Sequence, residues 1–215
     1  MFQLQNVDVK DVLEMRDVTL ESSVISVEGQ SGSGKSTFLR LLNNLDSPTS
    51  GNILFKGRNL LDIPPQELRK QVVMVPQNPV IFDGSIRDNL QIGHMFTGET
   101  NPTDDQMKEM LYHLWLDKSL HTKASDLSGG EMQRLSLGRV LLLNQAEAYL
   151  LDEPSSDLDD RTGRHVMKYF IERAQEQNKQ TIMVTHDTSI TEQFATMCVN
   201  MDQYSKQIRK EDERK

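Results

Sequence analysis

The chain has 215 residues, and its 32 acidic residues against 24 basic ones give a net charge of −8, which disfavours a general nucleic-acid binder because such proteins need a basic surface. Its apolar runs fall well short of the roughly 20 residues that cross a bilayer. A single cysteine, Cys198, excludes an internal disulfide and a CxxC metal pair. We therefore expect an intracellular protein without a structural metal.

Short apolar runs alternate with longer helical patterns along the chain. This alternation is typical of an α/β fold with a largely parallel sheet that is covered on both faces. The predicted strands are residues 24–28, 53–55, 72–75, 149–151, 182–185 and 197–201.

Apolar stripes predict helices over residues 38–45 and 166–174. Capping-box sequences predict further helix starts at Thr103 and Ser128. From this order of elements we expect the following organisation: one domain over residues 1–205, a helical subdomain inserted at about residues 78–142, and a charged, disordered tail over residues 206–215.

A glycine-rich loop stands between the predicted strand at residues 24–28 and the helix after it, which is where a phosphate-binding loop must lie. Glycines there let backbone N–H groups turn inward around phosphate oxygens at the positive end of the helix. Lys35 is expected to contact the β- and γ-phosphates, and Ser36 to place its hydroxyl on Mg²⁺. The pattern indicates a P-loop NTPase whose predicted nucleotide-binding residues are Gly29, Gln30, Ser31, Gly32, Ser33, Gly34, Lys35, Ser36 and Thr37.

A second loop-to-helix motif, Leu-Ser-Gly-Gly-Glu-Met-Gln-Arg, occupies residues 127–134. Ser128 caps a helix whose first turn exposes glycine amides, and this makes another anion site, one more than a single ATP needs. The octapeptide resembles the signature sequence of the ABC transporter family. The resemblance implies an α/β, ABC-type nucleotide-binding domain with a RecA-like mixed sheet core and a helical subdomain. It also implies that ATP held by the opposite subunit is bound by Ser128, Gly129, Gly130 and Glu131.

The predicted strand near residue 150 ends in two carboxylates, Asp152 and Glu153. A buried strand must deliver such a pair to the edge of the sheet, where P-loop folds keep their Mg²⁺. By resemblance to the same family, Asp152 acts on the metal, directly or through water. Glu153 resembles the general base that polarises the attacking water.

Three further pieces follow in the order of that family. Gln77 resembles the Q-loop glutamine that touches Mg²⁺ and water, residues 155–159 resemble the D-loop that crosses the dimer interface, and His186 resembles the switch histidine that contacts the γ-phosphate. The predicted catalytic residues are Glu153, His186, Gln77 and Lys35. The predicted metal ligands are Ser36, Gln77 and Asp152.

Two stretches depart from the family pattern. Most members carry an aromatic residue shortly after the first strand that stacks on adenine, whereas residues 6–12 contain none and Phe2 lies too early to substitute. We therefore predict weaker or differently supported adenine contacts and relaxed discrimination between ATP and GTP. The D-loop carries Asp157 where a small residue is commoner.

The resemblance implies a head-to-tail homodimer that binds ATP and Mg²⁺ and powers a separate membrane-spanning permease at the cytoplasmic face of the cell membrane. Residues 78–90, with Phe82 and Ile86, are the predicted docking segment because they follow the Q-loop. The run from Pro79 to Leu90 also resembles the ATPase halves of small two-component metal-linked ABC systems. That similarity implies a role in iron export or aluminium tolerance.

Two readings from other classes are weighed against transport. A soluble ABC ATPase of translation or DNA repair would usually carry two cassettes or a long inserted coiled coil, and the sequence shows neither. The acidic balance also disfavours a nucleic-acid partner. A P-loop kinase or GTPase leaves the signature octapeptide and His186 unexplained.

Overall fold

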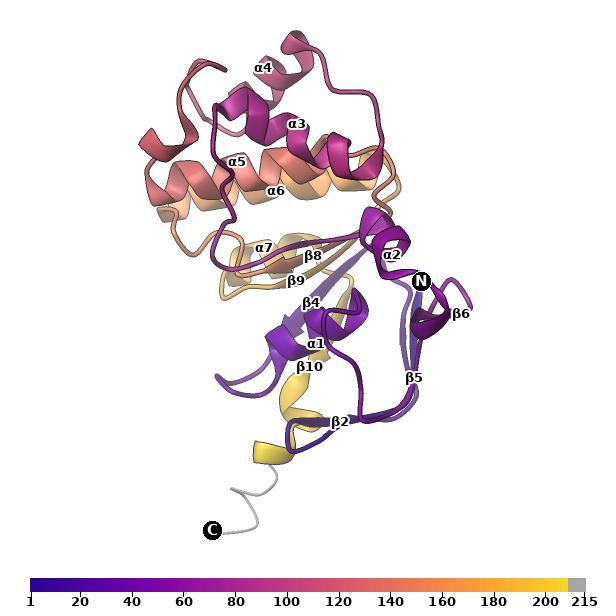
Figure 1. Ribbon diagram of the computed structural model, residues 1–215. Helices are drawn as coiled ribbons and strands as arrows, with labels where there is room; N and C mark the ends of the chain where they lie inside the picture. Colours follow the sequence, from indigo (N-terminus) through magenta and orange to yellow (C-terminus); the bar gives the residue numbers. More distant parts are fainter. Residues whose placement is uncertain (209–215) are drawn as a thin grey trace.

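A computed structural model describes residues 1–208, which form two five-stranded sheets with helices packed against them (Figure 1). The helices α3 to α6 gather at one end of the molecule, and the antiparallel strands lie at the other (Figure 1). The predicted disordered tail falls largely on residues 209–215, which lie outside the described part of the chain. The α/β class expected from the sequence is confirmed.

The first sheet is entirely parallel, with the strand order β10-β4-β9-β8-β7. Along β8, Ala148 and Leu150 pack into one core cluster, while Tyr149 and Leu151 pack into a second cluster on the opposite face. Successive side chains of a strand point to opposite faces, so this division means that both faces are covered, as predicted. The strands are β4 (Val24–Glu28), β7 (Val72–Val75), β8 (Ala148–Asp152), β9 (Gln180–Val184) and β10 (Met197–Asn200).

The second sheet is antiparallel, with the order β2-β1-β5-β6 and with β3 also paired to β1. The expected mixed core is thus divided into one parallel and one antiparallel sheet, and only residues 53–55 of the second sheet were predicted as strand. Its strands are β1 (Phe2–Val9), β2 (Leu13–Met15), β3 (Val18–Leu20), β5 (Ser50–Phe55) and β6 (Arg58–Asn59).

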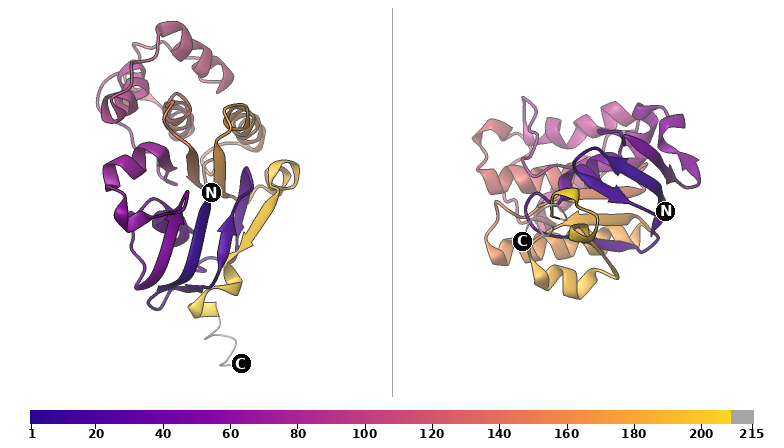
Figure 2. Two further views of the ribbon diagram at one scale, coloured as in Figure 1. Left: turned by 90° about the vertical axis from the view of Figure 1, so that its right-hand side faces the viewer. Right: turned by 90° about the horizontal axis from the view of Figure 1, so that it is seen from below.

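Helix α1 (Lys35–Leu42) joins the two sheets. Its buried residues Phe38, Leu39, Leu41 and Leu42 belong to one core cluster together with residues of β1, β5, β4 and β8. Figure 2 shows the same arrangement from two further sides. The short elements η1 (Leu60–Asp62) and α2 (Pro65–Gln71) then lead into β7.

The opposite face of the parallel sheet is covered by α6 (Asp160–Glu176), with α5 (Gly129–Leu141) and α7 (Thr188–Phe194) beside it. Phe170 of α6 meets Tyr149 of β8 edge to face at 5.1 Å between ring centroids. The chain continues after β10 into η3 (Met201–Gln203).

The segment predicted as a helical subdomain contains α3 (Ile86–Thr97), α4 (Asp104–His113), η2 (Ala124–Asp126) and α5. Nine residues between Ile86 and Leu135 form a core cluster of their own. The capping boxes at Thr103 and Ser128 are present as predicted, and Ser85 with Asp88 forms another at the start of α3. The exact bounds of the subdomain stay a prediction.

Candidate active site

The residues predicted to handle nucleotide follow four neighbouring parallel strands, so the sheet brings them to one edge. Val27 of β4 pairs with Val184 of β9, which also pairs with Asp152 of β8. The glycine loop, Asp152, Glu153 and His186 therefore start at the same level of the sheet. Gln77, two residues beyond β7, follows the next strand and is exposed. The carboxyl ends of parallel strands are where ligands bind in such sheets.

The glycine loop has a backbone that other residues rarely adopt. Gly29, Gly32 and Gly34 all have positive φ angles, of 138°, 81° and 96°. The Lys35 ammonium donates to the carbonyls of Gly29 at 2.7 Å and Gln30 at 2.9 Å. Because both acceptors are uncharged, the Lys35 charge remains available to phosphate oxygens, and the loop fits a nucleotide triphosphate tail.

Asp152 and Ser36 fit a hard cation beside the loop. Asp152 is only 7% exposed, and this burial raises the pKa of its carboxyl group, while a hydrogen bond from the Ser36 side chain acts in the opposite direction. In residues 1–208 no group of three His, Cys, Asp or Glu side chains could hold a metal ion. A site of this composition suits Mg²⁺, which takes one or two protein ligands and completes its shell with phosphate oxygens and water.

Glu153 and His186 form a pair at the same edge of the parallel sheet. The Nε2 atom of His186 lies 3.2 Å from Oε1 of Glu153. Glu153 has a φ of 48°, a left-handed conformation that is uncommon outside glycine, and its N–H donates to the carbonyl of Val184 at 2.9 Å. The strand-to-loop turn thus aims the Glu153 carboxylate away from the strand and toward the histidine. Such a pair can orient a water molecule.

The Ser128 turn is built as a helix start. Ser128 Oγ accepts from the N–H of Glu131 at 3.4 Å, and the Glu131 carboxylate accepts from the N–H of Ser128 at 2.9 Å. That backbone hydrogen bond, with help from Lys118 at 3.2 Å, lowers the pKa of Glu131. The Glu131 carboxylate is therefore occupied by Ser128 and Lys118. The groups that this turn offers to an anion are the N–H groups of Gly129 and Gly130.

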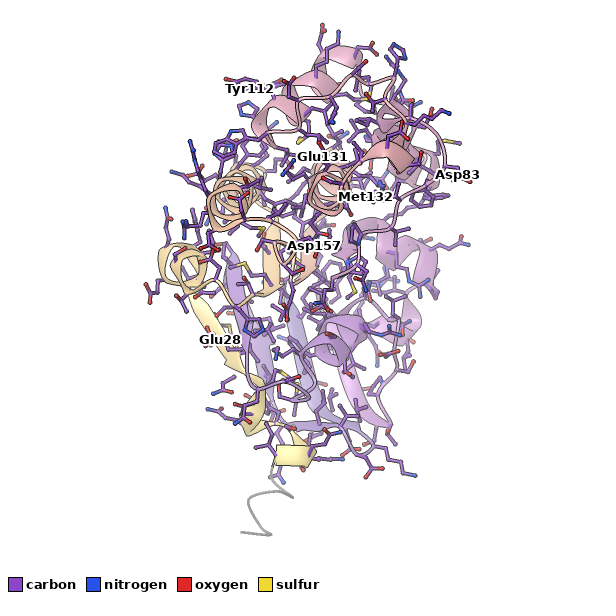
Figure 3. All side chains as sticks on the ribbon, turned by 90° about the vertical axis from the view of Figure 1, so that its left-hand side faces the viewer. Glu28, Asp83, Tyr112, Glu131, Met132 and Asp157 are labelled. Atoms are coloured by element: carbon purple, nitrogen blue, oxygen red, sulfur yellow. The ribbon has the colours of Figure 1, made fainter. Side chains whose placement is uncertain are left out.

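The Ser128 turn lies away from the glycine loop of the same chain. Figure 3 places Glu131 among the helices of the upper half and Glu28, which directly precedes the glycine loop, beside the strands of the lower half. The Ser128 turn and the glycine loop of one chain therefore belong to different parts of the molecule.

The first turn of α5 packs on the loop that follows Glu153. A Cβ added to Gly130 would lie 3.0 Å from the carbonyl oxygen of Asp157 and 3.1 Å from Cδ2 of Leu158. Gln133, fully buried, donates to the carbonyl of Pro154 at 2.9 Å. These contacts join the signature helix to the predicted D-loop. Asp157 itself is exposed, and nothing in the structure explains the acid at this position.

The structure excludes Phe2 as a support for adenine, because its ring is fully buried and lies 4.9 Å from the ring of Phe55. A side chain that does border the glycine loop is Val12, which carries no sequence motif of its own. A Cβ added to Gly34 would lie 3.3 Å from Cγ1 of Val12 and 3.4 Å from Cδ2 of Leu13. In the stretch where the family pattern has an aromatic residue, Val12 thus presents an aliphatic side chain to the glycine loop.

The predicted docking segment needs one correction. Ile86 is fully buried inside the helical core cluster, because it begins α3 on the side that faces α4, so it cannot contact a partner. Exposed apolar side chains lie instead on a groove of about 700 Å³, where Val80 is 51%, Met95 73% and Phe96 67% exposed. Phe82 also lines the groove, 6.2 Å from Phe96 between ring centroids.

Comparison with known proteins places this geometry in context. The chain matches the protein-family model described as ABC transporter over residues 17–156. It is 37% identical over 175 residues to protein STAR1 of Oryza sativa subsp. japonica, and the alignment covers 81% of this chain and 50% of the rice protein. It is 33% identical over 193 residues to ABC transporter I family member 17 of Arabidopsis thaliana, and the alignment covers 87% of this chain and 73% of that protein. The chain therefore spans half the length of the rice relative.

The fold is also similar to a solved structure, that of a dimeric ATP-binding cassette in a post-hydrolysis state bound to ADP and Pi. The TM-score is 0.79 at 25% sequence identity, and the alignment covers 93% of this chain and 94% of that one. Across the part of the chain that the structure describes, no helix is both long and apolar enough to span a membrane.

Proposed function

The chain belongs to the ABC transporter family, and from that premise we propose that it binds ATP with Mg²⁺ and hydrolyses it to drive a transporter whose membrane-spanning part is a separate permease. The observation that carries the proposal is the sheet edge. A phosphate loop in which Lys35 donates to two backbone carbonyls lies there next to a buried Asp152 and a Glu153–His186 pair.

In this proposal Lys35 and the loop amides bind the β- and γ-phosphates, and Ser36 with Asp152 binds the metal. Mg²⁺, when bound, neutralises charge on the phosphates. Glu153 accepts a proton from the attacking water, and His186 orients Glu153 and contacts the γ-phosphate. Gln77 contributes to the metal and water contacts from the end of β7.

We further propose that two copies of the chain associate head to tail. The Gly129 and Gly130 amides of one copy then bind the γ-phosphate held by Lys35 of the other. Support comes from the separation of the Ser128 turn from the glycine loop of its own chain (Figure 3) and from the dimeric state of the similar cassette. When the two copies close, each γ-phosphate contacts the start of α1 in one copy and the start of α5 in the other.

The groove lined by Val80, Met95 and Phe96 is the proposed docking site for the permease. Arg69 and Lys70 also line it, so it suits a short segment that combines apolar side chains with an acidic one. Bound there, the chain would lie at the cytoplasmic face of the cell membrane. The narrower proposal, export of iron, is supported only by the resemblance of residues 79–90 to metal-linked ABC systems.

The test is co-purification of the full chain from detergent-solubilised membranes. We expect a polytopic membrane protein to co-purify, and its loss when Met95 and Phe96 are both changed to Glu. Tyr112→Glu is the matched control, because Tyr112 is 77% exposed and does not line the groove. Recovery of ribosomes or DNA instead would favour a soluble ABC ATPase. Equal recovery in the Met95/Phe96 variant would move the docking site elsewhere.

A further inference from the structure

After β10 the chain turns back toward the phosphate loop, and Asp202 contacts Gln30 there. The Oδ1 atom of Asp202 accepts a hydrogen bond from the N–H of Gln30 at 2.8 Å, with a sequence separation of 172 residues. Asn200 fixes Asp202 in turn, because its side-chain oxygen accepts from the Asp202 N–H at 3.0 Å. We call residues 200–207 the C-terminal brace.

The C-terminal brace is anchored on its other side to the antiparallel sheet. The N–H of Glu14 donates to the carbonyl of Tyr204 at 2.9 Å, and the N–H of Lys206 donates to the carbonyl of Val12 at 3.0 Å. Ser205 is fully buried and forms a β-bridge with Leu13. Backbone hydrogen bonds of residues 204–206 to the antiparallel sheet therefore hold the segment that carries the Asp202 carboxylate.

The brace also packs directly on the glycine loop. A Cβ added to Gly29 would meet Oδ1 of Asp202 at 2.8 Å and Oγ of Ser33 at 2.7 Å. A Cβ added to Gly32 would lie 3.6 Å from Oε1 of Gln207. Asp202 and Ser33 thus fill the space beside Gly29 in which any other residue would place its Cβ, so the brace and the loop lie against each other there.

We propose that Asp202 is a positioning residue for the phosphate loop, and this inference rests on the ATP-binding function proposed above. A carboxylate that accepts the Gln30 N–H keeps that group turned away from the phosphates, so the following amides keep the inward orientation that an anion needs. The C-terminal brace thereby sets the affinity for ATP without touching the reacting atoms.

Two effects of Asp202 oppose each other, and they can be separated by charge. As a hydrogen-bond acceptor Asp202 orders the loop, whereas as an anion close to the phosphates it repels ATP. Asp202→Asn keeps an acceptor oxygen and removes the charge, while Asp202→Ala removes both. If positioning dominates, we expect Asp202→Ala to weaken MgATP binding on the order of tenfold, the net effect of one lost hydrogen bond, and Asp202→Asn to stay within about threefold of wild type.

The experiment measures the Kd for MgATP by calorimetry and kcat at saturating ATP on the full chain. Asp105→Ala, an exposed acid in the first turn of α4, is the matched control. We expect Asp202→Ala to raise Kd and KM with kcat unchanged, and the control to behave as wild type. Should Asp202→Ala fold poorly, Asn200→Ala tests the same link with a smaller expected loss of affinity, since it loosens only the support of Asp202.

Wild-type affinity in both Asp202→Ala and Asn200→Ala would overturn the inference, and so would tighter binding in both Asp202 variants, which would make Asp202 a repelling charge. A fall in kcat equal to the fall in affinity would also contradict it, because a positioning residue of the binding loop acts on affinity. Failure of the wild-type chain to bind MgATP would reject the proposed function itself, a distinct result.

Discussion

Arg139 of α5 donates from Nη2 to the side-chain oxygen of Asn89 on α3 at 2.9 Å, and from Nε to the Asn89 carbonyl at 2.9 Å. Its Nη1 reaches the carbonyl of Val80 at 2.8 Å. Arg139 is 8% exposed, and burial lowers its pKa to about 10. Because Asn89 also bonds both the N–H and the carbonyl of Phe82, this pair ties the signature helix to the proposed docking groove.

We predict that Arg139→Met loosens the docking segment. The variant leaves the Val80 carbonyl without its Arg139 donor and removes both bonds to Asn89, so it should lower the free energy of unfolding by about 2–4 kcal/mol, the usual loss when one partner of a buried polar network is removed. Hydrogen exchange should rise at the Phe82 amide. Arg16→Met is the control, since the Arg16 side chain is 82% exposed. Unchanged exchange at Phe82 would show that Arg139 does not hold the segment.

Motifs that are local in sequence could be predicted, and contacts across the fold could not. The strand, loop and helix around Lys35 follow one another directly, and the capping boxes at Thr103 and Ser128 each need only four residues. Apart from residues 53–55, the antiparallel sheet escaped prediction because β1 pairs with β5, as in Phe2 with Phe55, across the whole first parallel unit. Its strands β1 to β3 stand before β4 and α1, and β5 and β6 come after them, so no continuous run of strands reveals the sheet.

The same limit applies to the candidate site. Asp152, Glu153 and His186 follow predicted strands, so their common edge could be foreseen from a parallel sheet. Arg139 and Asp202 could not, because Arg139 bonds backbone carbonyls and Asp202 a backbone N–H, and every residue type except proline carries that N–H. No side-chain pattern marks such partners. Ile86 was misplaced because an apolar residue in a loop-to-helix turn suits a core as well as an interface.

Lys179 gives the stability of the fold a specific dependence on pH. It is 7% exposed, donates to the carbonyl of Leu143 at 2.6 Å and to the Tyr149 hydroxyl at 3.1 Å, and burial lowers its pKa from 10.5 to about 8. Between these two values the unfolded chain binds a proton that the folded chain releases. The free energy of unfolding therefore rises with pH above about 8.

We predict that this rise reaches on the order of 2 kcal/mol between pH 7 and 9.5 and disappears in Lys179→Met. Urea unfolding at several pH values measures it, and the range stops at 9.5 because burial raises the pKa of Tyr149 and its ionisation acts in the opposite direction. Lys168→Met, on the exposed face of α6, should retain the rise. A parallel pH profile for wild type and Lys179→Met would assign the effect to other groups.

Val12 borders the glycine loop where an aromatic residue is expected in this family, and this predicts comparable hydrolysis of ATP and GTP by the wild-type chain. Val12→Tyr should strengthen ATP binding at least about fivefold, because stacking on a base contributes roughly 1–3 kcal/mol. Competition between the two nucleotides measures the change. Thr19→Tyr, exposed on β3, is the control. A strong ATP preference in the wild type would contradict the prediction.

Gly130 and Gly129 differ in the space around them, and this predicts unequal tolerance. A side chain at Gly130 would press on the Asp157 carbonyl oxygen at 3.0 Å, whereas one at Gly129 would meet Asp157 Oδ2 at an ordinary 3.7 Å. Gly130→Val should therefore push the helix start off the D-loop and lower ATP turnover at least about tenfold through lost amide contacts. Gly129→Ala should retain most turnover. Wild-type turnover in Gly130→Val would remove the Ser128 turn from the reaction.

Glu153→Gln separates ATP binding from hydrolysis. Glutamine keeps the size of the side chain beside His186 but cannot accept a proton, so turnover should fall by about 10²–10⁴-fold, the usual contribution of a general base. MgATP should still bind, and two copies should stay associated in size-exclusion chromatography with ATP because the phosphate is not cleaved. Glu172→Gln, on the exposed surface of α6, should hydrolyse ATP like wild type. Phosphate release at the wild-type rate in Glu153→Gln would assign the base role to another group at this edge.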